Sequence, residues 1–381
     1  MKKIIVNKSE KIMLVSSFSV ILLAVLLLSN TVVQPKLSST TSNSLKVYLN
    51  IDVYDVNGVL KDSRYKPDDL AMNNFGLWVS SLVTSPDIAV TATFTRESAG
   101  SDAVSVRYAY IYGFALGLSG TDGGFIAVGT GTTSPTITNN DLEAEVFTKV
   151  EVGDSTYSNG NVTIIGTVPC TSSQNITVAG FYMQNGATNY NYLMFRDTFS
   201  DITVVDTDTI VITYTLMLSN EFTDNFGKIL CGMLSSIDAN EPTKNYTLSD
   251  VDGNSITVNY ASGEGASPTT WVFDTTYGVS PMVGIGIGTG TTAPDHSDYS
   301  LETQVETITS MVRPSYDGGN VTVTAVHVTT GSRAITEVGL FMYVRTTGGD
   351  PEQVLLWHDT FTAENVGSGE AVSTTMFMSV T

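Results

Sequence analysis

The chain has 381 residues, of which 42% are apolar and 15% are charged, and its formal net charge at pH 7 is −20. This length has room for two or three domains and enough apolar residues to bury a core in each. Residues 1–40 contain five lysines and one glutamate, so the other 341 residues hold 13 basic and 37 acidic side chains. Because an acidic field of this size repels phosphate backbones and anionic headgroups, nucleic acid is excluded as an expected partner.

The N-terminal segment predicts export. Four lysines precede residue 12, and Ile12 to Val33 form a run of 22 residues without a charge. A helix of this length spans a bilayer core of ~30 Å, and the basic flank places the rest of the chain outside. We favour an uncleaved membrane anchor at residues 1–33, with a cleaved signal as the alternative. Residues 34–44, rich in Ser and Thr, predict a short stalk.

The first predicted strand is Leu45–Val53, where apolar and polar residues alternate, and Asn57-Gly58 predicts a hairpin turn behind it. Pro67-Asp-Asp69 then predicts the start of a helix, whose apolar face carries Met72, Phe75, Val79 and Leu82. Runs rich in Val, Ile, Thr and Tyr follow, and they predict strands at Ile88–Thr95, Ser105–Ile111, Asn161–Val168, Ile176–Met183 and Ile210–Leu218.

One stretch of the sequence occurs twice. Val128–Pro135 and Ile287–Pro294 share Gly-Thr-Gly-Thr-Thr-x-Pro, and nine of the nineteen positions from each start are identical at an offset of 159 residues. The second half therefore predicts the same elements, with a helix at Phe222–Leu234 and strands at Ser255–Tyr260, Val321–Val328, Glu337–Val344 and Val372–Val380. The prediction is a mainly β protein with two tandem antiparallel β-sandwich-like domains, residues 45–219 and 220–381, each with one amphipathic helix.

The repeated glycine-rich stretch does not predict a phosphate loop, because no lysine follows its last glycine. We interpret it as a strand end that leaves the sheet. Acidic turns are candidate Ca²⁺ ligands, but none has the order of an EF-hand loop, and turns favour these residues for backbone reasons. We expect no cofactor, with calcium as the alternative at the turns that contain Asp206, Asp208, Asp250, Asp252, Asn254, Asp295 and Asp298.

No catalytic or metal-binding residues are predicted, since His296, His327 and His358 lie in separate segments. Cys170 and Cys231 occupy non-equivalent positions in the two copies, so either one disulfide joins the copies or both are buried thiols. Four sequons are candidate glycosylation sites, at Asn161, Asn175, Asn245 and Asn320.

Several motifs recur in order through residues 45–381. They include Asn74-Phe-Gly76, the Gly-Thr-Gly-Thr-Thr-x-Pro stretch with Leu-Glu behind it, Arg196-Asp197 and Val338-Gly-Leu-Phe. Their order resembles uncharacterised β-rich domains of structural proteins of tailed phages and of virus-like or surface proteins of thermophilic archaea. The resemblance implies a role in structure and display, and it brings no catalytic residues.

We therefore expect a non-enzymatic, extracellular structural or interaction protein of a cell surface, appendage or virion. One alternative is a glycan- or ligand-binding surface module that uses Tyr190, Tyr192 and Trp271, and another is a secreted hydrolase. We also expect self-association into filaments or rings, in which Leu45–Val53 of one subunit extends the sheet of Val372–Val380 in its neighbour. The alternative is that both end strands pair inside their own chain.

Overall fold

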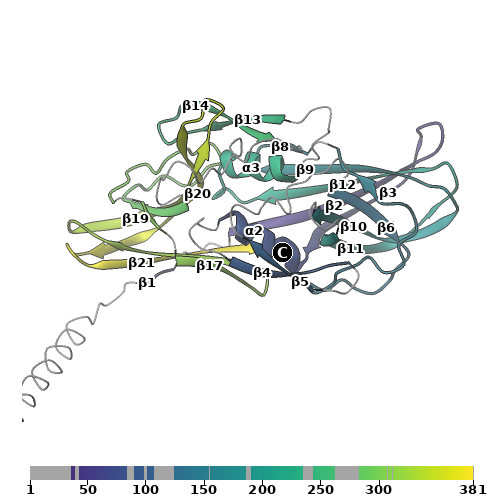
Figure 1. The fold of residues 1–381 in the computed structure, drawn as a ribbon, viewed down its shortest axis with the longest axis horizontal. Coiled ribbons are helices and arrows are strands. Elements are labelled where there is room, and N and C mark those ends of the chain that lie inside the picture. Colours follow the sequence, from purple (N-terminus) through teal and green to yellow (C-terminus); the bar gives the residue numbers. More distant parts are fainter. Residues whose placement is uncertain are drawn as a thin grey trace, which may run out of the picture.

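The computed structural model describes residues 36–38, 43–83, 90–97, 101–106, 124–153, 155–185, 190–234, 243–261, 283–306, 308–310 and 312–380. These residues form a mainly β protein with two helices (Figure 1), which confirms the predicted class. The predicted membrane anchor at residues 1–33 lies outside them. None of the helices described is long and apolar enough to cross a membrane.

The described residues of the first half form one helix and twelve strands. They are β1 (Lys36–Ser38), β2 (Asn43–Tyr54), β3 (Leu60–Ala71), α2 (Asn73–Leu82), β4 (Val90–Thr95), β5 (Ser101–Val106), β6 (Gly124–Gly129), β7 (Val150–Glu151), β8 (Thr156–Ser158), β9 (Asn161–Pro169), β10 (Gln174–Asn185), β11 (Tyr190–Val204) and β12 (Thr209–Leu218).

The second half has the same order from its helix onward. It contains α3 (Asp224–Leu234), β13 (Thr243–Ser249), β14 (Ser255–Ala261), β15 (Val283–Gly288), β16 (Thr309–Ser310), β17 (Val312–Asp317), β18 (Asn320–Val328), β19 (Arg333–Arg345), β20 (Pro351–Val366) and β21 (Ala371–Val380). We call α2 to β12 repeat 1 and α3 to β21 repeat 2.

Strand pairing follows the duplication residue by residue. β10 pairs with β6 and β11, and β19 pairs in the same register with β15 and β20. The irregularity between Ile176 and Val178 recurs between Ile335 and Glu337, at the 159-residue offset. β9 with β12 and β18 with β21 also share one register. The sequence repeat is therefore a repeat of backbone geometry.

One predicted helix start is wrong. Pro67-Asp-Asp69 lies in β3, a strand that the sequence did not reveal, and α2 begins only at Asn73. β3 pairs with β2 as Val47↔Asp69 and Leu49↔Lys66, with a register shift between these pairs. The shift falls around Pro67, which cannot donate a ladder hydrogen bond and is tolerated at such irregularities. The part of the Ser105–Ile111 strand prediction beyond Val106 lies outside the described residues.

The repeats share their interior. A 13-stranded sheet runs through both, in the order β17-β18-β21-β2-β3-β11-β10-β6-β7, with β1, β8, β9 and β12 attached beside this path. The main cluster of buried apolar side chains also contains residues of both repeats, for example Phe195 and Trp357. The buried apolar side chains of the two repeats are therefore continuous, and the division into two domains near residue 219 stays a prediction.

The repeated Asn-Phe-Gly motif ties each helix to the hairpin behind it. The Asn74 amide group donates to the carbonyls of Thr95 (2.8 Å) and Leu193 (3.2 Å), and its oxygen accepts from the Thr95 N–H. Asn225 makes the same three bonds, with Ser249 and Leu355 as partners. Both asparagines are buried. The motif therefore satisfies the hairpin's inner backbone groups.

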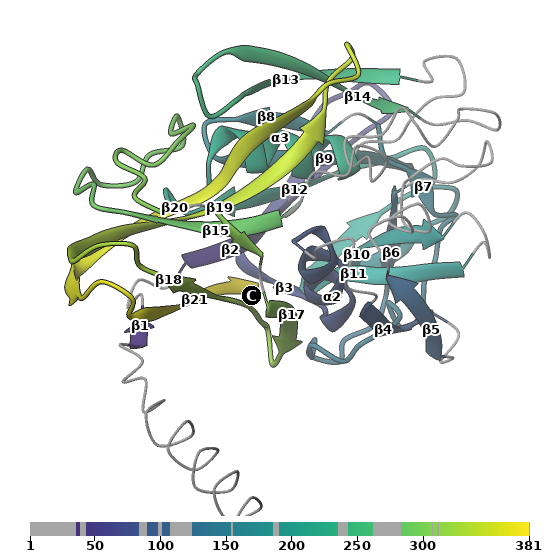
Figure 2. The ribbon, with the colours of Figure 1, turned by 60° about the vertical axis from the view of Figure 1, so that its left-hand side comes forward.

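The glycines of the motif receive a tyrosine from the other repeat. Figure 2 shows β8 beside α3 and β17 beside α2. The ring of Tyr157 in β8 lies against Gly227 of α3, and the ring of Tyr316 in β17 lies against Gly76 of α2. A Cβ atom at either glycine would be 2.0 Å from the ring, so only glycine fits. Tyr157 and Tyr316 are equivalent at the 159-residue offset. Because the contacts are reciprocal, the repeats pack like the two halves of a two-fold dimer.

The end strands are paired inside the chain. β2 lies between β12 and β3, with ten residue pairs to β12, and β21 pairs along its length with β18. The expectation that Leu45–Val53 and Val372–Val380 are exposed edges is therefore wrong for the first strand. The second edge of β21 is treated below, and self-association stays a prediction.

Candidate functional site

Each glycine-rich stretch is a loop that leaves the end of a strand. Loop 1, Gly129–Pro135, follows β6, and loop 2, Gly288–Pro294, follows β15. An isolated bridge joins Gly129 to Glu145 and its equivalent joins Gly288 to Gln304. The geometry agrees with the interpretation as a strand end. It also leaves several loop N–H groups that need acceptors.

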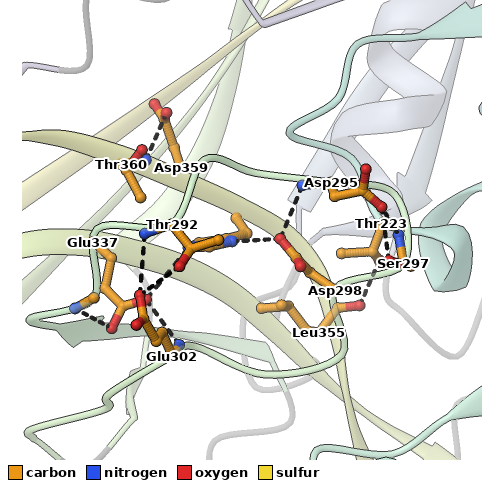
Figure 3. Close-up of polar contacts among 12 residues, drawn as sticks. Thr223, Thr292, Asp295, Ser297, Asp298, Glu302, Glu337, Leu355, Asp359 and Thr360 are labelled. Carbon is orange, nitrogen blue, oxygen red and sulfur yellow. Dashed lines mark hydrogen bonds and ion pairs between the residues drawn. The ribbon is translucent and has the colours of Figure 1, made fainter.

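Two carboxylates of repeat 2 supply these acceptors to loop 2 (Figure 3). Glu337 of β19 is fully buried and accepts N–H bonds from Gly290 (2.7 Å), Glu302 (3.0 Å) and Thr303 (2.8 Å). Glu302 in turn accepts from the backbone of Thr291 and from both N–H and hydroxyl of Thr292, at 2.9 to 3.1 Å. Loop 2 is thus held by side chains from a strand and from its own return segment.

A buried histidine links this network to a second acid. His358 of β20 is 3% exposed. Its Nδ1 is 2.7 Å from Asp298 Oδ2, and its Nε2 is 3.3 Å from Glu337 Oε2. Burial alone would lower the pKa of His358, but the two carboxylates outweigh it and raise the pKa to about 9. We call Asp298, Glu302, Glu337 and His358 the acid–histidine brace.

The same contacts lower the pKa of Glu337. Burial by itself would raise this pKa. The His358 bond and the three backbone N–H bonds act in the opposite direction and prevail, so the pKa lies below its ordinary value. At neutral pH the brace therefore contains a buried ion pair between Glu337 and His358.

The polar groups of the brace are engaged with loop 2 and with one another. A general base needs a free ring nitrogen within reach of a substrate. Both nitrogens of His358 face carboxylates, and the side chain is almost inaccessible. The nearby Ser297 hydroxyl donates to Asp295 at 2.7 Å and not to the histidine. This arrangement fixes a loop and leaves no group free to attack a substrate there.

Repeat 1 supports loop 1 with different chemistry. Arg196, which is 1% exposed, donates to Asn139 Oδ1 (3.1 Å) and to the Thr133 carbonyl (3.0 Å). Its Nη2 also lies 3.7 Å from Glu143 Oε2. We call Arg196, Asn139 and Glu143 the arginine brace. The residues of repeat 1 that are equivalent to His358, Asp298, Glu302 and Glu337 are Arg196, Asn139, Glu143 and Val178, respectively. The glutamate pair alone is conserved in type between the repeats.

The candidate calcium turns use their carboxylates internally. Asp250 accepts the N–H groups of Asp252 (2.9 Å) and Asn254 (2.7 Å), and Asp295 accepts that of Ser297 (2.9 Å). Within the described ranges, no group of three or more His, Cys, Asp or Glu side chains could hold a metal ion. Asp208 pairs with Lys61, while Asp206 is exposed in the same turn. These contacts fit the interpretation as structural turns.

The two cysteines are buried, and neither forms a disulfide in the structure. Cys170 follows β9, and Cys231 lies in α3 with its Sγ 3.4 Å from Ser155 Oγ. Burial raises the pKa of the Cys170 thiol to about 11, which makes it a weak nucleophile at neutral pH. The disulfide that the sequence allowed is not formed here, and the alternative of two buried thiols describes the structure.

The four sequons lie at the surface. Asn175, Asn245 and Asn320 are exposed, and Asn161 is half-buried. Asn161 and Asn320 open the equivalent strands β9 and β18. Their accessibility is a requirement for glycan transfer, and their occupancy stays a prediction.

The aromatic residues of the glycan-binding alternative are not grouped at the surface. Tyr192 is fully buried and contacts Phe94 edge-on, so its assignment to an exposed loop is wrong. Tyr190 is 39% exposed, with the Arg96 guanidinium 4.5 Å from its ring centre. Trp271 lies outside the described residues. No observation therefore favours this alternative.

The three histidines lie in three separate environments. His296 places Nδ1 2.6 Å from the Phe222 carbonyl, and its ring fills the space beside Gly160. His327 is buried in β18, and burial lowers its pKa to about 4. Only His358 belongs to the brace. Sequence reasoning missed the brace. One signal pointed to it: the two positions of repeat 2 that carry His358 and Glu337 both differ from their equivalents in repeat 1, Arg196 and Val178.

Comparisons with protein-family models, with curated proteins and with solved structures found no match. The resemblance to phage and archaeal surface domains stays a prediction. The function is therefore argued from the geometry of this chain.

Proposed function

We propose that this chain is a non-enzymatic structural or interaction protein outside the cell, on a surface, an appendage or a virion. The observation that carries the proposal is the reciprocal packing of the repeats, in which Tyr157 and Tyr316 each fill a glycine site of the other repeat. Together with the shared core, this packing makes a single stiff body from a duplicated unit. Stiffness and repetition suit a building element better than a catalyst.

The use of polar side chains supports the same conclusion. Glu337, His358 and Arg196 are the buried charges one would first test for chemistry, and all three hold loops. The acidic exterior and the accessible sequons suit a location outside the cell. In this proposal residues 1–33 anchor the chain in a membrane. The segment expected as a stalk, residues 34–44, is in part within the fold, because Lys36–Ser38 and Asn43–Ser44 pair with β21.

We also propose that each repeat is a sandwich-like unit. In repeat 1 the rings of Phe181 in β10 and Phe195 in β11 lie 6.4 and 5.5 Å from the ring of Tyr214 in β12. A Cβ atom at Gly166 of β9 would lie 2.7 Å from Ile126 of β6. These contacts support two layers, β6-β10-β11 facing β9-β12-β2, with side chains interdigitated between them.

The test is accessibility on intact source cells or particles. An antibody against the folded part should label surface structures in negative-stain microscopy, and protease added to intact cells should remove the antigen. A cytoplasmic protein measured in the same samples should stay intact. Antigen that is protected until the cells are lysed would contradict the proposal.

A further inference from the structure

The equivalent strands β12 and β21 differ in what pairs with one of their edges. β12 and β21 are equivalent at an offset of 162 residues, and each pairs on one side with its own neighbour, β9 or β18. On its other side β12 is covered by β2 over ten antiparallel residue pairs, from Thr209↔Tyr54 to Leu218↔Leu45. Repeat 2 lacks a long strand at the equivalent place within the described residues.

What covers that side of β21 is the N-terminal segment. Lys36–Ser38 run parallel to Ser373–Thr375, and Asn43–Leu45 run parallel to Met378–Val380. The chain then passes at Leu45 from β21 to β12. Among the strands described, β1 pairs with β21 alone. The first of these contacts is therefore short and independent of the rest of the fold.

The sequence of β21 indicates that its edge is made to be covered. Neither the ten residues of β21 nor those of β12 include a charged residue or a proline. Exposed edge strands normally carry charged residues or proline, which prevent pairing with other chains. β3 shows this protection, since it carries Lys61, Arg64, Lys66 and Pro67. An uncharged edge whose residues Ser373–Thr375 are covered by the three residues of β1 alone accepts another strand readily.

We infer that the partner of this edge is the β1 segment of a second copy of this chain, which takes the place of the chain's own β1. The exchanged segment makes the same contacts, so the exchange itself costs little. Five peptide steps separate Ser38 from Asn43 and reach about 17 Å when extended, so the neighbour's β21 must lie close by. Short connections of this kind favour exchange between chains. The inference rests on the proposed function, because it describes how such subunits join.

The test uses the register partners Leu37 and Thr374 in the full chain. Leu37→Cys and Thr374→Cys are placed in two separately tagged chains, which are expressed together and then oxidised. We expect a disulfide-linked species that carries both tags and is lost when either cysteine is omitted. The double variant in one chain should give a ladder of linked subunits on a non-reducing gel.

A matched control is the pair Tyr48→Cys and Thr215→Cys, which are partners on β2 and β12. This pair should link only within one chain. The inference is overturned if Leu37→Cys and Thr374→Cys link only within one chain, or if they do not link in either form. Surface assemblies seen by microscopy together with either of these results would keep the proposed function and remove only the exchange. The absence of surface assemblies would instead contradict the proposed function itself.

Discussion

Loop 1 and loop 2 leave the sheet at equivalent positions, with the same glycines and threonines, yet they rest on different charges. The Arg196 guanidinium binds loop 1, whereas loop 2 is bound by Glu337, which His358 contacts from the neighbouring strand. The backbone of both loops needs partners because it cannot continue the ladder. The fold therefore fixes where support is needed and leaves its chemistry open.

The buried glutamate of repeat 2 depends on the cation beside it. A carboxylate buried at the position of Val178 is costly unless a cation lies beside it. In repeat 2 that cation is His358, and the equivalent position in repeat 1 also carries a cation, Arg196. Loss of Glu337 alone removes the acceptor of three N–H groups.

Beside the loops, charged side chains of repeat 1 have uncharged equivalents in repeat 2. Lys149 of repeat 1 bridges Glu97 and Glu145, both at 2.6 Å, and lies 4.8 Å from the Tyr182 ring centre. The equivalents of Lys149, Glu145 and Tyr182 in repeat 2 are Ile308, Gln304 and Phe341. Repeat 1 thus has an ion-pair cluster at a place where repeat 2 has uncharged side chains.

The largest effect is expected when one member of the acid–histidine brace receives its repeat 1 counterpart. Glu337→Val should lower the free energy of unfolding by about 3–5 kcal/mol, because it removes one partner of a buried ion pair and leaves the charged His358 with Asp298 as its remaining carboxylate. It also removes the acceptor of three N–H groups. Urea denaturation measures the change. The exposed Glu364→Val serves as the control and should shift stability by no more than about 0.5 kcal/mol.

The complete transplant sharpens this result. Adding Asp298→Asn and His358→Arg to Glu337→Val rebuilds the arginine brace in repeat 2. We expect the triple variant to recover more than half of the stability that the single variant loses, since coupled residues are not additive. A triple variant as unstable as the sum of its parts would show that the braces are not interchangeable units.

A pH dependence in loop 2 alone comes next. The pKa of His358 in the folded protein is about 9, above its ordinary value of 6.5, so its contribution is complete below pH 6.5 and is lost as the pH rises through 9. The pKa of Glu337 is lowered, so its contribution is present above 4.5 and is lost in more acid solution. The alkaline loss amounts to about 3 kcal/mol at ~1.4 kcal/mol per pH unit.

Amide hydrogen exchange measures this difference locally. The N–H groups of Thr291 and Thr292 should lose protection relative to that of Thr133 between pH 7 and 9.5, after correction for the intrinsic rate. Arginine keeps its charge through this range, so loop 1 should not respond. The alkaline range also avoids His327, whose lowered pKa affects stability only in acid. Equal losses in both loops would refute the assignment to His358.

In the arginine brace we expect a smaller, pH-independent effect. Arg196→Met keeps the length of the side chain but removes its bonds to Asn139 and Thr133, which should cost about 2–3 kcal/mol. Glu143 is 48% exposed and stays solvated, so no buried charge is left behind. Arg196→Lys is the matched control and should recover only part of the loss, because lysine cannot donate from two fixed directions. Full recovery by lysine would mean that charge alone matters.

The smallest expected difference lies between the two interface tyrosines. Tyr157 donates to the Asp224 carboxylate at 2.6 Å, whereas Tyr316 donates to the Asn73 amide oxygen at 3.1 Å. Tyr157→Phe should cost about 1.5–3 kcal/mol and Tyr316→Phe about 0.5–1.5 kcal/mol, because bonds to charged groups are stronger. Thermal unfolding of both variants gives the order. A larger loss for Tyr316→Phe would contradict it.

Sequence periodicity revealed much of the fold. Alternation identified strands such as Ile210–Leu218, and spacings of three and four identified the helix that carries Phe75 and Val79. It failed for β3, where Lys61, Arg64 and Pro67 mask the strand. A charged strand lacks the alternation that burial would impose, so only its pairing with β2, and with β11 at Leu70 and Ala71, defines it.

The sequence by itself determined the β class and the duplication, because burial on one face of a strand leaves a period of two and a repeat leaves a constant offset. Only the tertiary structure decided that the repeats share a core, that Tyr157 and Tyr316 cross between them, and that Glu337 meets His358. These contacts join residues far apart in the chain, and a one-dimensional pattern contains no distances. The repeated Asn-Phe-Gly motif can be seen in the sequence, but the requirement for glycine follows only from the tyrosine ring of the other repeat that packs against it.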